Sequence, residues 1–318
     1  MNRYFRIAAK MVLFYSPQFI KDRIASRKLK RDLSRARAIA KRTKVSQEQV
    51  NDALNQFSFD TDVMLHSSII NIGKVEGGAR AITNIILDYV NIHEHTLLVS
   101  ALPYRGNYAS WLKEDWVFDV RKAPIAMGAI NERIAKMDCA YRSIHPTHSV
   151  VALGPKAEEY TSEHSLGETP FSKYSPYYKL IVNHGKVLLF GTKLNNMTLV
   201  HAIEDMLGDV FPVKVYENKT YDIKCIDNNG EPLTVKTPVH SRFQGIFRDG
   251  TRMYDQLVKY GAIKTVKIGE SEISLVDSLS YTNAYLDFLA DGFSIYGTHQ
   301  VTPSLLQRIN EIKTMLGL

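Results

Sequence analysis

The sequence predicts an α/β fold: a mixed sheet flanked by helices, with a basic helical extension at the N-terminus. Short apolar runs, which are typical of buried strands, alternate along the chain with segments whose apolar residues recur at helical spacing. Positive charge is concentrated in the first 45 residues. At 318 residues, of which 45% are apolar, the chain is long enough to bury a full core.

The first 45 residues differ in composition from the rest of the chain. They carry 14 Lys or Arg against Asp22 and Asp32, whereas the rest carries 26 basic and 31 acidic side chains. Aromatic and aliphatic residues are interspersed with the cations, and Pro17 interrupts the stretch, which predicts a pair of basic amphipathic helices. We therefore divide the chain into a basic helical arm, residues 1–45, and a globular domain, residues 46–318.

Two interpretations of the arm stay open. Its cations could contact an anionic membrane surface, where each Lys or Arg contributes about 1 kcal/mol. Alternatively, the helices pack on the domain or on a partner protein. Nucleic acid is not expected as a partner, because nothing else in the chain offers a base-reading module.

The domain begins with a helix predicted over 46–57, because Ser46 and Gln49 form the Ser-x-x-Gln pattern of a capping box. A strand follows at 62–69, and glycines then lead into a helix that ends near Val90. Further apolar runs predict strands at 96–102, 149–153 and 186–191, and further periodic segments predict helices at 126–136 and 197–207.

Cysteine usage and hydropathy point to the cytoplasm. Cys139 and Cys225 lie in unrelated contexts, so neither a disulfide framework nor a four-thiolate zinc site is expected. No apolar run approaches the ~18 residues that a spanning helix needs, and the longest run near the start is too short for a signal-peptide core. We expect a cytoplasmic protein, peripheral on the inner face of the membrane if the arm binds lipid.

A glycine-rich turn after the strand at 62–69 is the first candidate site. Ser67 and Ser68 end the strand, and Gly77 and Gly78 open the next helix, so hydroxyls and free backbone N–H groups are available to an anion. Arg80 adds a positive charge. The segment is neither a Walker loop nor a dinucleotide fingerprint, and a plain turn is the alternative interpretation.

The second candidate site lies on the helix at 197–207, directly after a strand. Thr198, His201 and Glu204 fall on one stripe of this helix, because residues three and four apart share a face. The opposite stripe is apolar. Such a helix holds an imidazole rigidly, and a carboxylate one turn away can orient it. The alternative is a purely structural histidine.

The third candidate site precedes the strand at 149–153. Pro146 forces His145 into an extended conformation, which places His145 and Ser149 at the mouth of the strand, where side chains can face a cleft. No His-x-x-x-His or paired-thiolate spacing supports a metal site, so no metal is expected. No Gly-x-Ser-x-Gly elbow supports an esterase triad.

Four stretches in register resemble the aminoglycoside 3-N-acetyltransferase family. They are "VMLHSSIINIGKVEGGARAITNII", "RSIHPTHSVVALGPKAEEYTSEHSLGE", "SPYYKL" and "GKVLLFGTKLNNMTLVHAIE". The resemblance runs from about residue 46 to near residue 290. It implies a mixed sheet flanked by helices and the transfer of an acyl group from coenzyme A to a primary amine of an amino sugar.

The resemblance also implies which residues hold the co-substrate, acetyl-CoA or another acyl-CoA. His66, Ser67 and Ser68, with the helix start at Gly77 and Gly78, would hold the phosphates and the pantetheine arm. This agrees with the anion site inferred above from the glycine-rich turn.

The catalytic residues implied by the resemblance come from the second and third sites. His201 is implied as the base, Glu204 as its support and Thr198 as a neighbour of the thioester carbonyl, with His145 and Ser149 beside them lining the cleft. An unperturbed histidine pKa of ~6.5 suits deprotonation of an amine, and such help contributes ~10² to 10⁴-fold. We expect direct transfer in a ternary complex, with His145 as the next candidate for the base.

The segment after the strand at 96–102 departs from the family pattern. The drug-modifying enzymes carry an acidic insertion there, whereas this chain has "ALPYRGNYASWLKEDWVFDVRK", with a balance of +1. We assign Tyr104, Arg105 and Ser149 to the acceptor. Because like charges repel, an amino sugar linked to a phosphate or nucleotide, as in surface-polysaccharide synthesis, is expected ahead of an aminoglycoside. The alternatives are an aminoglycoside N3-acetyltransferase and a non-catalytic scaffold that docks on a membrane.

Overall fold

A seven-stranded mixed sheet forms the centre of the domain in the computed structural model, which describes residues 3–104, 112 and 116–318. The strand order is β11-β12-β8-β2-β4-β7-β6. Strands β2, β4 and β8 run parallel, and the other neighbours pair antiparallel. The bounds are β2 Val63–Ser67, β4 Leu97–Ser100, β6 Tyr141–Arg142, β7 Val150–Leu153, β8 Lys186–Phe190, β11 Ile263–Ile268 and β12 Ser271–Asp277.

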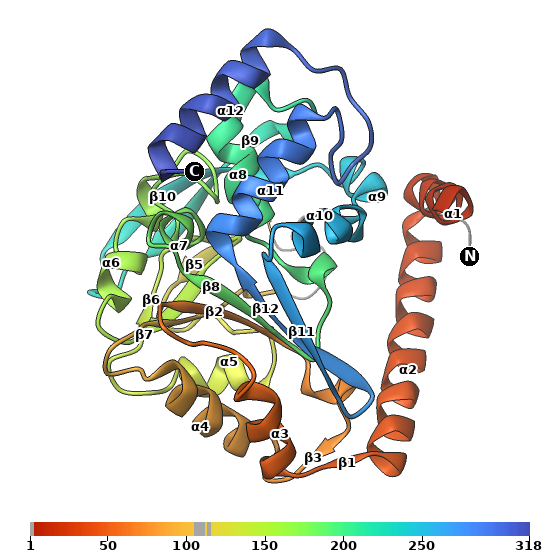
Figure 1. Ribbon diagram of the computed structural model, residues 1–318. Coiled ribbons are helices and arrows are strands. Elements are labelled where there is room, and N and C mark those ends of the chain that lie inside the picture. Colours follow the sequence, from red (N-terminus) through yellow and green to blue (C-terminus); the bar gives the residue numbers. More distant parts are fainter. Residues whose placement is uncertain (1–2, 105–111, 113–115) are drawn as a thin grey trace.

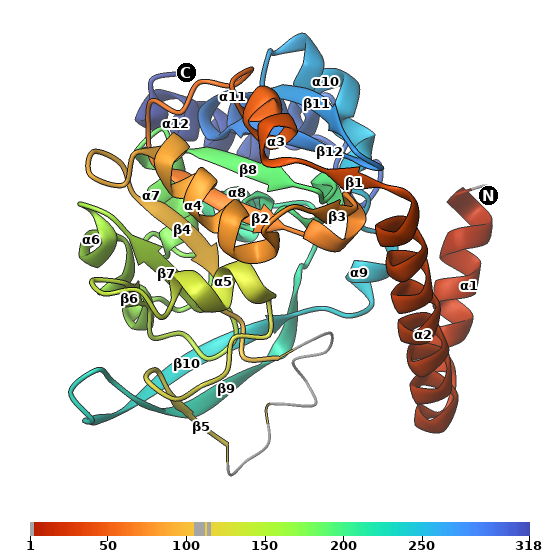
Figure 2. The same ribbon diagram turned by 90° about the horizontal axis from the view of Figure 1, so that it is seen from below.

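Helices cover both faces of this sheet (Figures 1 and 2). Successive strand residues point to opposite faces, so Val63 and Leu65 join one buried cluster and Met64 joins the other. The first cluster lies under α3 Gln47–Leu54, α4 Gly78–Val90 and α5 Ala129–Ile134. The second lies under α6 Ala157–Thr161, α7 Pro176–Val182, α8 Val200–Leu207, α11 Ser278–Ala290 and α12 Pro303–Leu316. Both faces of the central strands are therefore buried.

The strands predicted from apolar runs and the helices predicted from periodicity are confirmed, with small shifts at their ends. The predicted strand at 62–69 is β2, and the predicted helix at 46–57 is α3, which begins with the expected capping box of Ser46 and Gln49. The helix at 197–207 starts later than predicted, at Val200, because a 3₁₀ turn occupies Leu194–Asn196. Thr198 therefore precedes the helix instead of lying on it.

A second, three-stranded sheet was not predicted from the sequence. Strand β9 Tyr216–Ile226 lies between β10 Pro232–His240, which is antiparallel to it, and β5 Val117–Asp119, which is parallel to it. A small core of its own includes Phe118, Ile223 and Val235. After β10 the chain forms the short helices α9 Gln244–Phe247 and α10 Tyr254–Lys259 before it returns to the main sheet.

The arm forms the predicted pair of helices, α1 Arg3–Tyr15 and α2 Gln18–Arg42, with Pro17 between them as the cap of α2. Figure 1 shows the arm at one side of the domain. The short strand β1 Lys44–Val45 then pairs with β3 Lys74–Val75 and joins the arm to the domain. None of the helices within the described residues combines the length and the apolar character needed to cross a membrane.

Arg142 on β6 fixes the loop that follows β4. Its guanidinium donates to the carbonyl oxygens of Ala101, Val120, Ala123 and Pro124, and its Nε donates to the Ser149 hydroxyl at 3.2 Å. Burial lowers the pKa of Arg142 to about 10, which still leaves the guanidinium charged at neutral pH. One side chain therefore ties the main sheet to both ends of the loop between β4 and α5.

We predict that Arg142→Leu lowers the free energy of unfolding by about 3 kcal/mol, because carbonyls that the guanidinium now satisfies lose their donor. Urea denaturation followed by circular dichroism measures this. The matched control is Arg121→Leu, which removes an exposed guanidinium paired with Asp119 and should leave the midpoint nearly unchanged. Equal midpoints for the Arg142 variant and the wild type would refute the role of Arg142.

Candidate active site

The candidate site lies at the edge of the sheet where the parallel strands β2, β4 and β8 end. In open α/β sheets, ligands bind outside the carboxyl ends of such strands. His66 and Ser67 end β2, and β8 is followed by Gly191, whose φ of +69° a residue with a side chain rarely adopts. A Cβ at Gly191 would lie 2.6 Å from the carbonyl oxygen of Ser68, so the chain passes closely here on its way to α8.

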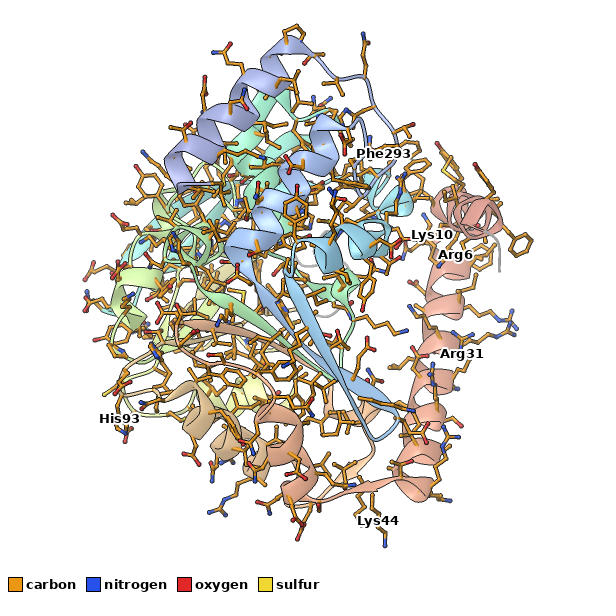
Figure 3. All side chains as sticks on the ribbon, viewed as in Figure 1. Arg6, Lys10, Arg31, Lys44, His93 and Phe293 are labelled. Carbon is orange, nitrogen blue, oxygen red and sulfur yellow. The ribbon has the colours of Figure 1, made fainter. Side chains whose placement is uncertain are left out.

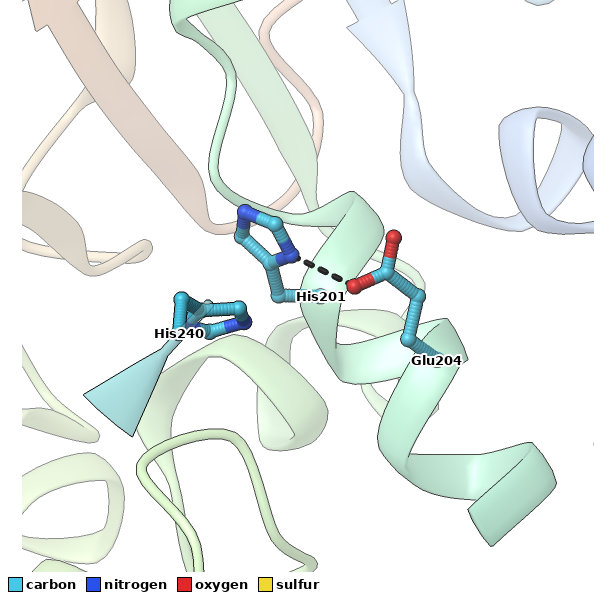
Figure 4. Close-up of side chains that lie close together, drawn as sticks. All are labelled: His201, Glu204 and His240. Carbon is cyan, nitrogen blue, oxygen red and sulfur yellow. Dashed lines mark hydrogen bonds and ion pairs between the residues drawn. The ribbon is translucent and has the colours of Figure 1, made fainter. Parts of the chain in front are cut away.

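His201 and Glu204 form a buried pair in α8. The Nδ1 atom of His201 lies 2.6 Å from Oε2 of Glu204, in a hydrogen bond across three residues of the helix (Figure 4). The Tyr296 hydroxyl donates to the other carboxylate oxygen, Oε1, at 3.1 Å. Figure 4 shows the second ring nitrogen of His201 turned away from Glu204. Thus Nδ1 of His201 is hydrogen-bonded to the Glu204 carboxyl group, and Nε2 is not part of this hydrogen bond.

Rings from distant parts of the chain enclose His201. The ring of His240, at the end of β10, lies 4.2 Å from the His201 ring between centroids, and the Phe171 ring lies 5.1 Å away. His201 is 6% exposed as a result. The second sheet therefore contributes to the enclosure of His201 through His240.

Burial dominates the electrostatics of this pair. It holds the pKa of His201 well below 6.5, with a smaller contribution from the positive charge of Arg248. Burial also raises the pKa of Glu204 to about 8, although Arg248 and the Tyr296 hydroxyl both act to lower it. As the pH rises through this value, the pair loses a proton. Nδ1–H then donates to a carboxylate, and Nε2 is able to accept a proton.

His201 and Glu204, together with His240, are also the residues that could hold a metal ion. Ligand atoms of His201, Glu204 and His240 lie within 4.8 Å of one another, and two imidazoles with a carboxylate are a donor set that zinc accepts. However, the 2.6 Å contact between Nδ1 and Oε2 is a hydrogen bond, and a metal bound to Nδ1 would have to displace its proton. The geometry fits an oriented imidazole better than a ligand set.

His145 does not lie beside His201, contrary to the expectation. Two further rings, those of His148 and His240, connect them in a series of contacts. The centroid separations are 6.2 Å from His145 to His148, 5.9 Å from His148 to His240 and 4.2 Å from His240 to His201. His145 is fully buried, and its Nδ1 accepts from the backbone N–H groups of Thr147 and His148. Its ring stacks on His164 at 4.5 Å. The turn at Pro146 therefore uses His145 as an internal brace.

Two of the three expected acceptor residues are structural. Ser149 is fully buried, donates to the Ser143 carbonyl at 2.8 Å and accepts from Arg142, so it lines no open cleft. Tyr104 is 5% exposed, and its hydroxyl donates to the Thr147 carbonyl at 2.9 Å. The sequence could not show this, because the Ser149 contacts depend on how β6 and β7 pair and the Tyr104 contact joins two different loops. Arg105 lies outside the described residues.

The expected coenzyme residues lie at the end of β2 and the start of α4. His66 is buried, and burial lowers its pKa to about 4, so its ring is neutral at pH 7. Its Nε2 lies 3.5 Å from the Thr198 hydroxyl, which brings Thr198 to the end of β2. The Ser67 and Ser68 side chains are half-buried, with the Ser68 hydroxyl accepting from Asn71.

The start of α4 is open to solvent. Gly77 caps this helix with a φ of +68°, and a Cβ there would lie 2.6 Å from the Cβ of Ala81, so a side chain does not fit. Gly78 opens the helix, and Arg80 in its first turn is exposed. The N–H groups of this first turn have no helical partners, which suits the anion expected from the sequence.

A cleft of about 960 Å³ lies next to α8, and Glu204 and Asp205 are among the residues that line it, although the Glu204 side chain itself is not exposed. Tyr216, whose hydroxyl donates to Asp205 at 2.8 Å, also lines the cleft. Burial raises the pKa of Asp205 to about 7. Other charged residues around the cleft are of both signs: Glu168, Asp209, Lys173, Lys214 and Arg308.

A buried imidazole that is hydrogen-bonded to a carboxyl group at the carboxyl edge of a mixed sheet is an arrangement that enzymes use for general-base catalysis. Residues 64–289 match the family of aminoglycoside 3-N-acetyltransferases, and the chain belongs to that family. It is therefore an acyl-CoA-dependent N-acetyltransferase. The expected family and the expected use of acyl-CoA as co-substrate are confirmed.

Named relatives agree with this assignment, and a solved structure shares the fold. Aminoglycoside N(3)-acetyltransferase III of Acinetobacter baumannii is 30% identical over 205 residues, which are 58% of this chain and 68% of the relative. Aminoglycoside N(3)-acetyltransferase IX of Micromonospora chalcea is 34% identical over 168 residues, 48% of this chain and 58% of the relative. AAC-IIIb, solved as a binary complex with CoASH, is 20% identical and superposes with a TM-score of 0.65 over 82% of this chain and all of its own. This likeness confirms the predicted fold.

Sequence reasoning missed His240, Tyr296 and Arg248. His240 on β10 lies 39 residues after His201, and Tyr296 lies 92 residues after Glu204, so no local spacing connects these residues with α8. The segment "SRFQGIFRDG", which contains Arg248 and directly follows His240, carries no motif that marks it as part of the site. A long-range contact is the one signal that identifies them.

We predict that Tyr296→Phe shifts the ascending limb of the kcat against pH profile to higher pH. The hydroxyl stabilises the charged form of Glu204, so its loss raises the pKa of that carboxyl and delays formation of the competent base. The variant should therefore be impaired at pH 7 and recover at high pH. Tyr281→Phe, which alters another buried tyrosine in the same core, is the control and should leave the profile in place. A profile that falls in height without shifting would contradict this assignment.

Proposed function

We propose that this chain transfers an acetyl group from acetyl-CoA to a primary amine of an aminoglycoside-class amino sugar, with His201 as the general base. The observation that carries the proposal is the buried hydrogen bond between His201 and Glu204. A carboxylate that holds Nδ1–H leaves Nε2 free to take a proton, which is the requirement for deprotonating an amine. Glu204 acts through His201 as a positioning residue.

The reaction needs one proton acceptor and one oxyanion donor. The amine nitrogen attacks the thioester carbonyl carbon while Nε2 of His201 takes a proton from that nitrogen. The C–S bond then breaks, the coenzyme leaves as a thiolate, and the imidazolium returns the proton to sulfur. The Thr198 hydroxyl or backbone N–H groups at the same edge of the sheet stabilise the carbonyl oxygen as it becomes negative. The coenzyme lies along the ends of β2 and the start of α4.

The raised pKa of Glu204 favours an acceptor with several ammonium groups. At pH 7 the buried carboxyl retains its proton, and a nearby positive charge lowers the pKa of a carboxyl. A polycationic sugar therefore promotes the charged carboxylate and, through it, the competent form of His201. A phosphate close to the pair would act in the opposite direction.

The net charge of the acceptor segment, +1, is a weak argument for a nucleotide-linked sugar. Two of the cations counted in the acceptor segment, Arg121 and Lys122, both pair with the Asp119 carboxylate, at 3.1 and 3.4 Å. The comparisons support an aminoglycoside acceptor, since the characterised relatives are named for one, and they give no support to polysaccharide synthesis. A cytoplasmic location, where acetyl-CoA is available, stays a prediction.

We predict that His201→Ala lowers kcat by about 10² to 10⁴-fold, because the amine loses its proton acceptor. Binding of coenzyme A, measured by calorimetry, should change little, since His201 acts on the amine. The comparison variant is His145→Asn, which removes the other expected base and should retain most of the turnover of the folded enzyme. If His201→Ala keeps its turnover and His145→Asn loses it, the two imidazoles have been assigned the wrong way round.

We predict that thiol release from acetyl-CoA is faster with sisomicin or gentamicin than with nucleotide-linked amino sugars, by at least about tenfold in kcat/KM. Mass spectrometry of the product tests whether one acetyl group is added to a ring amine. Faster turnover of the nucleotide-linked sugars would overturn the proposed acceptor but leave the base intact. No thiol release with either class would favour the non-catalytic scaffold instead.

A further inference from the structure

Helix α1 turns an aromatic face to solvent. Phe5, Val12 and Tyr15 are 64%, 70% and 72% exposed, and Phe19 at the start of α2 is 71% exposed. Val12 lies seven residues after Phe5 and three before Tyr15, so the three side chains of α1 share one side of the helix. Isolated exposed apolar residues are ordinary, but a row of them on one helix face indicates a binding surface.

The opposite side of α1 is seated on the domain, and it carries the cations. Lys10 donates to the Ile246 carbonyl at 3.0 Å, and Arg6 lies 3.9 Å from the Asp249 carboxylate. Phe14 packs edge-on against Phe243 at 5.8 Å. Figure 3 shows Arg6 and Lys10 on the side of α1 that faces the domain. Ile7, Met11 and Phe14 are half-buried on this side, so α1 already packs apolar residues on the domain and the exposed aromatic face is a second apolar surface that this packing does not use.

Helix α2 supplies positive charge next to this face. Its 25 residues include ten Lys or Arg against Asp22 and Asp32, and every residue from 22 to 35 is exposed. The domain does not neutralise these cations in the described residues: along this stretch the single recorded ion pair joins Arg31 to Asp32 of the same helix. The cations between residues 22 and 35 therefore remain available to an anionic partner, whereas Arg42 at the end of α2 pairs with Glu270 of the domain.

We propose that the arm docks the enzyme on an anionic lipid bilayer, with the aromatic face of α1 among the headgroups and α2 held by its cations. A lipid surface offers both features that the arm needs, an apolar boundary for aromatic rings and a layer of negative charge. Tyr and Phe are favoured at that boundary. At 1.5 Å per residue, α1 is about 20 Å long, which suits a helix lying along the surface.

Charge separates this partner from the other candidates. A nucleic acid would neutralise α2 but would leave the aromatic face of α1 in water, since phosphate contacts cover no apolar surface. A second copy of this chain could cover the aromatic face. However, its own arm would carry the same excess of cations, 14 against two acidic residues, so two arms repel. An anionic bilayer covers the aromatic face and attracts the cations, so neither objection applies to it.

The experiment is co-sedimentation of the full-length protein with vesicles of phosphatidylcholine alone or with added phosphatidylglycerol. We expect binding to the anionic vesicles, weakened by salt. Changing Phe5, Val12 and Tyr15 to Ser should lower the partition coefficient at least about tenfold, and changing Arg27, Lys28, Lys30 and Arg31 to Gln should have a similar effect. Acetyl transfer to a soluble acceptor should be unchanged in both variants, which separates this test from that of the active site.

The matched control changes three exposed apolar residues elsewhere on the domain, Val182, Val258 and Leu306, to Ser and should bind vesicles as the wild type does. Three results would overturn the proposal. The first is equal binding to neutral and anionic vesicles. The second is binding that survives loss of the aromatic side chains but not of the cations, which would indicate a general polyanion site. The third is no vesicle binding, with a dimer that dissociates when the aromatic face is changed.

Discussion

The His201 and Glu204 hydrogen bond depends on burial, and burial is what the rest of the fold supplies. In water, a carboxylate and an imidazole at this spacing would titrate near their ordinary pKa values and would share a proton only weakly. Inside the domain, the loss of water lowers the pKa of His201 and raises the pKa of Glu204 to about 8. The two groups are thereby forced to act as one unit, with a single proton leaving near the pH at which an amine also begins to lose its own.

That burial is built from three separate parts of the chain. Helix α8 fixes the two side chains three residues apart, β10 of the second sheet places His240 against the imidazole, and the segment before α12 brings the Tyr296 hydroxyl to the carboxylate. Because the second sheet also holds β5, its position depends on the loop that Arg142 fastens to the main sheet. The enclosure of the base is therefore a property of the tertiary fold and not of one motif.

What the sequence predicts depends on whether a feature is local or comes from the tertiary fold. Strand β2 and helix α8 were predicted because periodicity and the strand-to-helix order are local properties, and the pairing of His201 with Glu204 follows from helix geometry alone. Ser149 and His145 were misplaced because a position at the mouth of a strand does not show whether a side chain meets a cleft or a neighbouring loop. The Ser149 hydroxyl is hydrogen-bonded to the Arg142 side chain and does not face a cleft. The second sheet was missed because buried and exposed residues alternate along β9 and β10, so neither strand forms a continuous apolar run.

The arm raises a different question, because it lies before the matched region, which begins at residue 64. The family assignment therefore does not explain the arm, and its role has to be inferred from its own charges and contacts. The cations of α1 are used in contacts with residues 246–249, and Arg248 in this segment donates to the Met197 carbonyl and lowers the pKa of both His201 and Glu204. The surface that seats the arm is thus continuous with the segment that tunes the base. A helix held in this way presents its remaining face in a fixed orientation relative to the active site, which is what an enzyme needs if its acceptor is delivered at a charged surface.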